Sequence, residues 1–156
     1  MVIMGIDPGT AATGYGLIKK LQDKLEIIDY GCIRTETKFS TAERLKKIDQ
    51  QLIKLISKHK PERIAVEDIF FFKNLKTAVK VSQARGVILS RTVQPKVSVV
   101  EYTPLQIKQA VTGYGRADKK QVQKMVKVLL NLKEIPQPDD AADALAAAIC
   151  CAHSLR

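Results

Sequence analysis

The stretch that decides the fold is the opening one, "MVIMGIDPGTAATGYGLI" (residues 1–18). Residues 2–6 are apolar without polar alternation, which predicts a strand that is buried on both faces. Asp7 stands at the carboxyl end of that strand, directly before Pro8 and Gly9. An Asp in front of Pro-Gly also suits a plain turn. The role of this carboxylate therefore depends on what the rest of the chain brings to it.

The remaining pattern predicts one α/β domain over residues 1–156. Strand-like runs at 13–20 and 25–35 follow so closely that only hairpins can connect them, which predicts a three-strand antiparallel meander. Further strands are expected at 63–67 and 96–102, separated by helices. Helices are expected at 41–60, 74–93, 104–113, 119–130 and 139–155. This order indicates a mixed five-stranded sheet with parallel later strands and helices on both faces.

Caps and glycines mark several of these helices. Ser40 and Glu43 form a capping box before the first, Asn74 is expected to cap the second, and Asp118 caps the basic fourth helix. Gly86 lies inside the second helix, where a glycine costs about 1 kcal/mol relative to alanine. A close helix approach would explain Gly86, and the contact between two copies of the chain is the candidate.

The charge predicts a polyanionic partner. Against 16 Asp and Glu residues stand 26 Lys and Arg, a net charge of +10, which favours nucleic acid. The three cysteines are odd in number and two are adjacent, which is not typical of a disulfide framework and fits a reducing cytoplasm. The run "ALAAAICCA" falls short of the ~20 residues of a spanning helix, and no signal-peptide pattern opens the chain. We expect a cytoplasmic protein without a membrane partner.

Four carboxylates are candidates for one site. Asp140 and Asp143 are three apart at the start of the last helix, and Glu67 ends a strand as Asp7 does. Helix dipoles and strand ends can each explain an acidic residue on their own. Sites in α/β sheets, however, gather where strands end. A set of oxygen ligands suits Mg²⁺ or Mn²⁺, and two such ions roughly 3.5–4 Å apart can promote attack of water on a phosphodiester.

Five ordered segments carry a family resemblance: "GIDPGTAATGYG" (5–16), "AVEDIFFFKN" (65–74), "SQARGVIL" (82–89), "YTPLQIKQAVTGYGRADKKQVQKMV" (102–126) and "PDDAADALAAAI" (138–149). Together they resemble the RuvC family of bacterial Holliday-junction resolvases, within the ribonuclease H-like superfamily. The resemblance implies a ribonuclease H-like fold and a homodimer that nicks four-way DNA junctions symmetrically, leaving 5′-phosphate and 3′-hydroxyl ends. It also implies work beside the RuvA–RuvB branch-migration complex in recombination and repair.

The resemblance also assigns residues. Asp7, Glu67, Asp140 and Asp143 match the family's metal-binding catalytic quartet, which implies two Mg²⁺ per subunit, with Mn²⁺ as a substitute. Asp140 stands where some members carry histidine.

The same resemblance implies DNA contacts. Phe70 matches an aromatic residue that stacks on a base near the junction centre, and the neighbouring Lys73 suits the same role. Lys108 and Lys119 match basic residues near the scissile phosphate, with Lys120 as an adjacent alternative to Lys119. A solvated helix face also explains each lysine.

Two glycines and two rival functions remain open. Gly14 and Gly16 are expected to keep the approach to Asp7 free of side chains, although a hairpin would also need them. The first rival is the related ribonuclease H-like proteins proposed to trim ribosomal RNA precursors, which also begin with an Asp-x-Gly-Thr strand end. The second is an inactive module that binds junctions without cutting them.

Overall fold

The computed structural model describes residues 1–22, 24–68, 75–95 and 97–155. Its elements in chain order are β1 (Val2–Asp7), β2 (Ala12–Lys20), β3 (Leu25–Arg34), α1 (Thr41–His59), β4 (Arg63–Glu67), α2 (Leu75–Thr92), β5 (Ser98–Tyr102), α3 (Pro104–Thr112), α4 (Lys119–Leu129) and α5 (Asp139–Ser154). Every strand and helix expected from the sequence is present, with ends that shift by one or two residues. The expected cap Asn74 lies outside the described residues.

The five strands form one mixed sheet in the order β3-β2-β1-β4-β5. The first three strands pair antiparallel, which confirms the predicted meander. β1 then pairs parallel with β4, and β4 pairs parallel with β5. β1 is therefore the central strand, and the segment 2–6 has neighbours on both sides, as its unbroken apolar character predicts.

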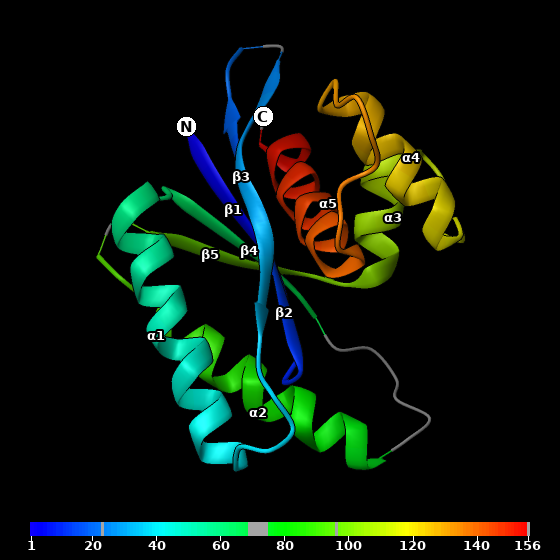
Figure 1. Cartoon of the computed structure of the whole chain (residues 1–156). Coiled ribbons are helices and arrows are strands. Elements are labelled where there is room, and N and C mark those ends of the chain that lie inside the picture. Colours follow the sequence, from blue (N-terminus) through cyan, green and yellow to red (C-terminus); the bar gives the residue numbers. More distant parts are fainter. Residues whose placement is uncertain (23, 69–74, 96, 156) are drawn as a thin grey trace.

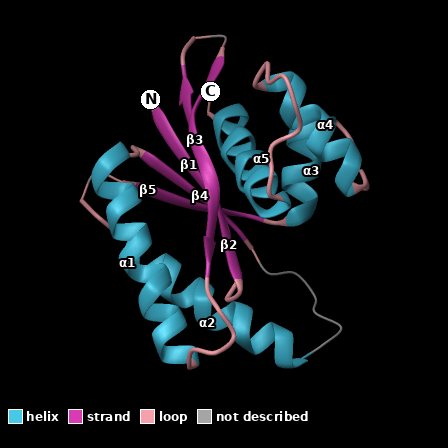
Figure 2. Cartoon of the chain, in the orientation of Figure 1, coloured by secondary structure: helices cyan, strands magenta, loops and turns pink. Residues whose placement is uncertain are grey.

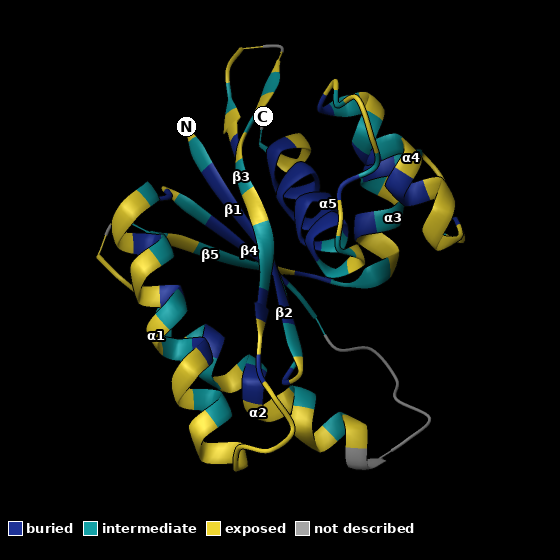
Figure 3. Ribbon diagram, viewed as in Figure 1, coloured by how far each residue is buried: buried dark blue, intermediate teal, exposed yellow. Residues whose placement is uncertain are grey.

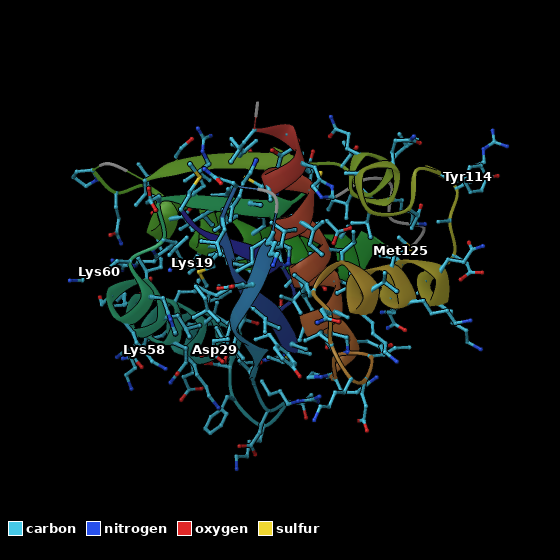
Figure 4. The ribbon with its side chains drawn as sticks, turned by 90° about the horizontal axis from the view of Figure 1, so that it is seen from above. Lys19, Asp29, Lys58, Lys60, Tyr114 and Met125 are labelled. Carbon is cyan, nitrogen blue, oxygen red and sulfur yellow. The ribbon has the colours of Figure 1, made fainter. Side chains whose placement is uncertain are left out.

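Helices cover both faces of the sheet, as Figures 1 and 2 show. One core, which includes Ile48, Leu52 and Ile88, lies between the sheet and the α1–α2 layer. A second core, with Ile107, Val126 and Leu145 among its members, lies between the sheet and helices α3, α4 and α5. The view from above shows the two layers on either side of the strands (Figure 4).

Local sequence signals fix the helix ends. Ser40 and Glu43 form the expected capping box, and α1 ends at Lys60, which adopts a left-handed conformation directly before Pro61. Thr103 caps α3 and Asp118 caps α4 in the same way, each with a glutamine three residues later. These side chains accept hydrogen bonds from amides that have no partner within the helix.

α5 is buried on nearly all sides rather than on one face. The run from Ala144 to Ala152 is fully buried, and Figure 3 shows the helix dark over most of its length. Its small side chains allow a close approach to the sheet, and glycines opposite complete the fit. A Cβ on Gly14 would overlap the carbonyl oxygen of Asp140, and one on Gly16 would lie 2.7 Å from Leu145. These glycines seat a helix, so the expectation that they keep Asp7 accessible was wrong.

Two further features bear on the sequence predictions. Cys32, Cys150 and Cys151 are all free thiols. Among the residues that the structure describes, no helix is long and apolar enough to cross a membrane.

Candidate active site

Asp7 and Glu67 lie at the carboxyl ends of neighbouring parallel strands. Ile6 of β1 stands opposite Val66 of β4, so the residues that follow them end side by side at one edge of the sheet. Both carboxylates are partly buried. The two strands are held by ladders on both sides, which fixes the backbone beneath each side chain.

The first two turns of α5 bring Asp140 and Asp143 to the same edge. The cap of this helix is Pro138, without a side-chain hydrogen bond, so neither Asp139 nor Asp140 serves as the N-cap. Because Asp140 lies directly over Gly14, which is the partner of Asp7 in the β1–β2 ladder, it lies one strand away from Asp7. The four predicted carboxylates thus come from two strands and one helix.

The electrostatics of the site reflect how close together these side chains lie. Burial, together with the charges of Glu67, Asp143 and Asp140, raises the pKa of Asp7 to about 8, against a smaller lowering by Lys119. Burial and the charge of Asp143 raise the pKa of Glu67 to about 7, although Lys108 and Lys119 partly oppose the shift. Each negative charge is therefore costly here unless a cation lies nearby.

Two of the predicted lysines border the carboxylates. The Lys119 ammonium donates to Asp143 Oδ2 at 2.9 Å and lies 3.4 Å from Asp139 Oδ2. A cavity of about 220 Å³ is lined by residues that include Glu67, Lys108, Lys119 and Asp143. Lys119 rather than its neighbour Lys120 lines this cavity.

The donor set fits a hard divalent cation by its chemistry. All four ligand candidates are carboxylates, and their mutual repulsion favours a bound cation. Among the described residues, however, no three His, Cys, Asp or Glu side chains are arranged so that they could hold a metal ion. The ammonium group of Lys119 neutralises Asp143 instead. The structure thus assembles the predicted side chains without aligning them as a ligand set.

Two site neighbours were missed from the sequence. Cys32 Sγ lies 3.9 Å from Asp140 Oδ2, because Cys32 stands opposite Gly14 in the β2–β3 ladder. Arg85 of α2 forms ion pairs with Asp68, at 2.8 Å, and with Glu101. Only strand register and helix placement reveal these contacts. Phe70 and Lys73 lie outside the described residues.

Comparison with known proteins identifies the family. A family model described as "Crossover junction endodeoxyribonuclease RuvC" matches residues 3–151. The chain belongs to the RuvC family. RuvC of Halothermothrix orenii is 56% identical over 100% of this chain and 94% of its own length. RuvC of Heliobacterium modesticaldum is 57% identical, over 99% of this chain and 96% of its own.

Solved RuvC structures agree with this assignment. Thermus thermophilus RuvC in complex with a Holliday junction substrate superimposes with a TM-score of 0.89 at 33% identity, covering 98% of this chain and 94% of that one. The yeast mitochondrial Holliday junction resolvase Ydc2 shares the fold, with a TM-score of 0.71 at 15% identity over 97% of this chain and 77% of that one. The ribonuclease H-like fold predicted from the RuvC resemblance is confirmed.

Proposed function

We propose that this chain is a crossover junction endodeoxyribonuclease that resolves four-way DNA junctions by paired, symmetric nicks during homologous recombination and DNA repair. The observation that carries the proposal is the convergence of Asp7, Glu67, Asp140 and Asp143 beside Lys108 and Lys119 at one edge of the sheet. Membership of the RuvC family supports it, as does the likeness to a relative solved with a Holliday junction substrate.

The proposed chemistry is hydrolysis of a phosphodiester that leaves a 5′-phosphate end. Two Mg²⁺ ions per subunit, replaceable by Mn²⁺, would be held by the four carboxylates and would supply an activated water and stabilisation of the leaving oxygen. Asp7 and Glu67 are held at fixed positions relative to each other because β1 and β4 are paired by hydrogen bonds. Lys108 and Lys119 place positive charge beside the carboxylates, where they bind and orient the scissile phosphate.

The remaining DNA contacts follow from charge and sequence. The net charge of +10 provides the attraction to the phosphate backbone that an acidic centre lacks. Lys120, exposed at the start of α4, adds to this attraction. Phe70 and Lys73 are proposed to contact bases near the junction centre, with the aromatic ring stacking on an unpaired base.

A homodimer with two such sites is proposed because a four-way junction presents two related strands. The exposed side of α2 suits the contact: a Cβ on Gly86 would meet nothing within 4 Å among the described residues, so none of these makes the close approach expected there. A second copy of α2 can approach closely at this position. Cooperation with the RuvA–RuvB complex in the bacterial cytoplasm completes the proposal.

The decisive experiment is strand-resolved cleavage of a mobile-core four-way DNA junction beside a linear duplex and a structured RNA, with Mg²⁺ or with EDTA. Asp140→Asn is the test variant, and Glu26→Gln, an exposed acidic residue on β3, is the matched control. We expect symmetric nicks in the junction alone, abolished by EDTA and by Asp140→Asn but retained by Glu26→Gln.

Each rival function has its own outcome in the same experiment. Tight junction binding without nicks under any metal condition would identify a binding module. Cleavage of the RNA but not of the junction would identify a ribonuclease and overturn the resolvase proposal.

A further inference from the structure

We infer that Arg34 is a substrate-binding residue that holds a phosphate of the cleaved strand on the flank of the site opposite Lys108 and Lys119. The inference rests on the proposed function and names a contact for that same site. It adds a third cation, from the edge strand β3, to the two that come from α3 and α4.

Strand register places Arg34 beside the carboxylates. Asp7 pairs with Gly14, and Gly14 pairs with Cys32, so these residues form a row across β1, β2 and β3. The Cys32 thiol faces the same side as Asp140, at 3.9 Å from its carboxylate. Since side chains two residues apart on a strand share a face, Arg34 points to this side of the sheet as well.

The guanidinium of Arg34 is available to a ligand. Arg34 is exposed, and β3 is an edge strand of the sheet. Within the described parts of the chain, no hydrogen bond or ion pair engages its guanidinium. A guanidinium without such a partner keeps its planar group of donors free for a phosphate.

The backbone next to Arg34 is fastened to the loop that follows Asp7. The Thr35 amide donates to the Ala11 carbonyl at 3.0 Å, and the buried Thr35 hydroxyl donates to the Thr10 carbonyl. Arg44 Nε in turn donates to Thr35 Oγ1 at 2.8 Å. Arg34 is therefore held at a fixed place relative to Asp7, which a residue that positions the substrate needs.

The two flanks define a path for the strand. Lys108 and Lys119 border the site on the side of Glu67 and Asp143, whereas Arg34 borders it beyond Gly14. β3 lies two strand spacings, or about 10 Å, from β1, and Arg34 lies two residues, or about 7 Å, farther along β3 than the row of Asp7, so it reaches a neighbouring phosphate rather than the scissile one. A strand that crosses the carboxylates from β4 toward β3 is then gripped on both sides of the bond to be cut.

The test combines variants with single neutral methylphosphonates placed in turn along the cleaved strand of a four-way junction. We compare the wild-type chain with Arg34→Gln and Arg34→Lys. The matched control is Lys24→Gln, which neutralises an exposed lysine directly before β3, at the opposite end of that strand from Arg34. We expect Arg34→Gln to weaken junction binding on the order of tenfold and to lower the salt slope by about 1. Arg34→Lys should be intermediate, and Lys24→Gln nearly unchanged.

Methylphosphonate coupling then locates the contact. Neutralising one phosphate beside the scissile bond should lower the junction affinity of the wild-type chain but lower that of Arg34→Gln little further. Neutralising any other phosphate should lower the affinity of both proteins by the same factor. The inference would be overturned if each methylphosphonate lowered the affinity of wild type and Arg34→Gln equally. It would also be overturned if Arg34→Gln bound the junction as tightly as Lys24→Gln. If the wild-type chain neither binds nor nicks junctions, the proposed function itself has failed. Unchanged thermal melting shows that Arg34→Gln still folds.

Discussion

At the scale of single residues, Asp7 and Glu67 are carboxylates held where a negative charge is unfavourable. The pKa values of about 8 and about 7 result first from burial and then from the neighbouring acids. The unfolded chain ionises these groups near pH 4, whereas the folded chain does so only near pH 7 to 8. The folded state therefore binds more protons across that window, and its stability falls as the pH rises from about 4 to about 8.

The Asp7→Asn variant should raise the melting temperature when divalent cations are absent. Removing this charge at pH 8 relieves first the cost of burying it and then the repulsion from three carboxylates, which together raise the free energy of unfolding by on the order of 2 kcal/mol. Each kcal/mol raises the melting temperature of a chain of this size by roughly 2–4 °C. Circular dichroism melts at pH 5 and pH 8 in EDTA measure the effect, which should be smaller at pH 5.

The matched control is Glu26→Gln, which removes an exposed carboxylate far from the site. Its melting temperature should stay within about 1 °C of wild type at both pH values. An Asp7→Asn protein that melts no higher than wild type at pH 8 would contradict the clustering of charge around Asp7.

At the scale of elements, helix caps and helix seating place the groups of the site. Lys119 is the first residue of α4, directly after the capping residue Asp118, so the cap sets the position of the ammonium that contacts Asp143. α5 reaches the sheet closely because Gly5 and Gly14 present no side chains to it. If α4 frayed or α5 shifted, Lys119 or Asp140 would move with its helix even though neither side chain had been replaced.

Replacing the cap by Asp118→Ala should affect both stability and catalysis. Loss of the capping box lowers the free energy of unfolding by about 1 kcal/mol and frays the helical turn that carries Lys119. Ser40→Ala removes the equivalent box from α1, which is remote from the site, and is the matched control. Melting temperatures should fall alike for both variants, while single-turnover junction cleavage slows further only for Asp118→Ala. Equal cleavage rates would show that the α4 cap does not position Lys119.

The seating of α5 is tested with Gly14→Ala. The added methyl group would overlap the Asp140 carbonyl, so the helix has to move off the sheet, at a cost of about 1–3 kcal/mol. Cleavage should fall together with the melting temperature because Asp140 moves with the helix. Ser57→Ala, at an exposed position of α1, is the control and should leave the free energy of unfolding within about 0.5 kcal/mol of wild type. A Gly14→Ala protein as stable as wild type would contradict the close seating of α5.

At the scale of the whole molecule, a basic exterior surrounds an acidic centre, and the sheet separates two helical layers. The carboxylates lie on the α3–α5 side, while α1 and α2 cover the other face. Ion pairs such as that of Lys58 and Asp29, 3.7 Å apart, join α1 to the sheet on that second face (Figure 4). Because the carboxylates lie on the other side of the sheet, two copies of the chain can join through their α1–α2 layers without blocking access to the site.

The proposed homodimer predicts a specific sensitivity at α2. Gly86→Lys places a long charged side chain at the proposed contact without an internal clash, so the chain should fold yet sediment as a monomer. Gln50→Lys, on the exposed side of α1, adds the same charge and should leave the dimer intact. Analytical ultracentrifugation measures both, and strand-resolved cleavage should show single rather than paired nicks for Gly86→Lys. A dimeric Gly86→Lys protein would exclude this contact.

The sequence by itself determined the elements and predicted which carboxylates meet at one edge of the sheet. Apolar runs, capping boxes at Ser40 and Asp118, and the Pro61 stop are local signals, so they need no knowledge of the fold. Asp7 and Glu67 could be assigned to one site because the carboxyl ends of parallel strands meet at one edge.

Only the tertiary structure decided what depends on register and seating. The row from Asp7 through Gly14 to Cys32 exists because of two ladders, and it alone places Arg34 beside the site. Gly14 admits a helix rather than a phosphate because α5 lies against it, a contact between residues that are far apart in the chain. Local sequence sets local conformation, whereas the raised pKa of Asp7 results from burial and from charges that only folding brings together.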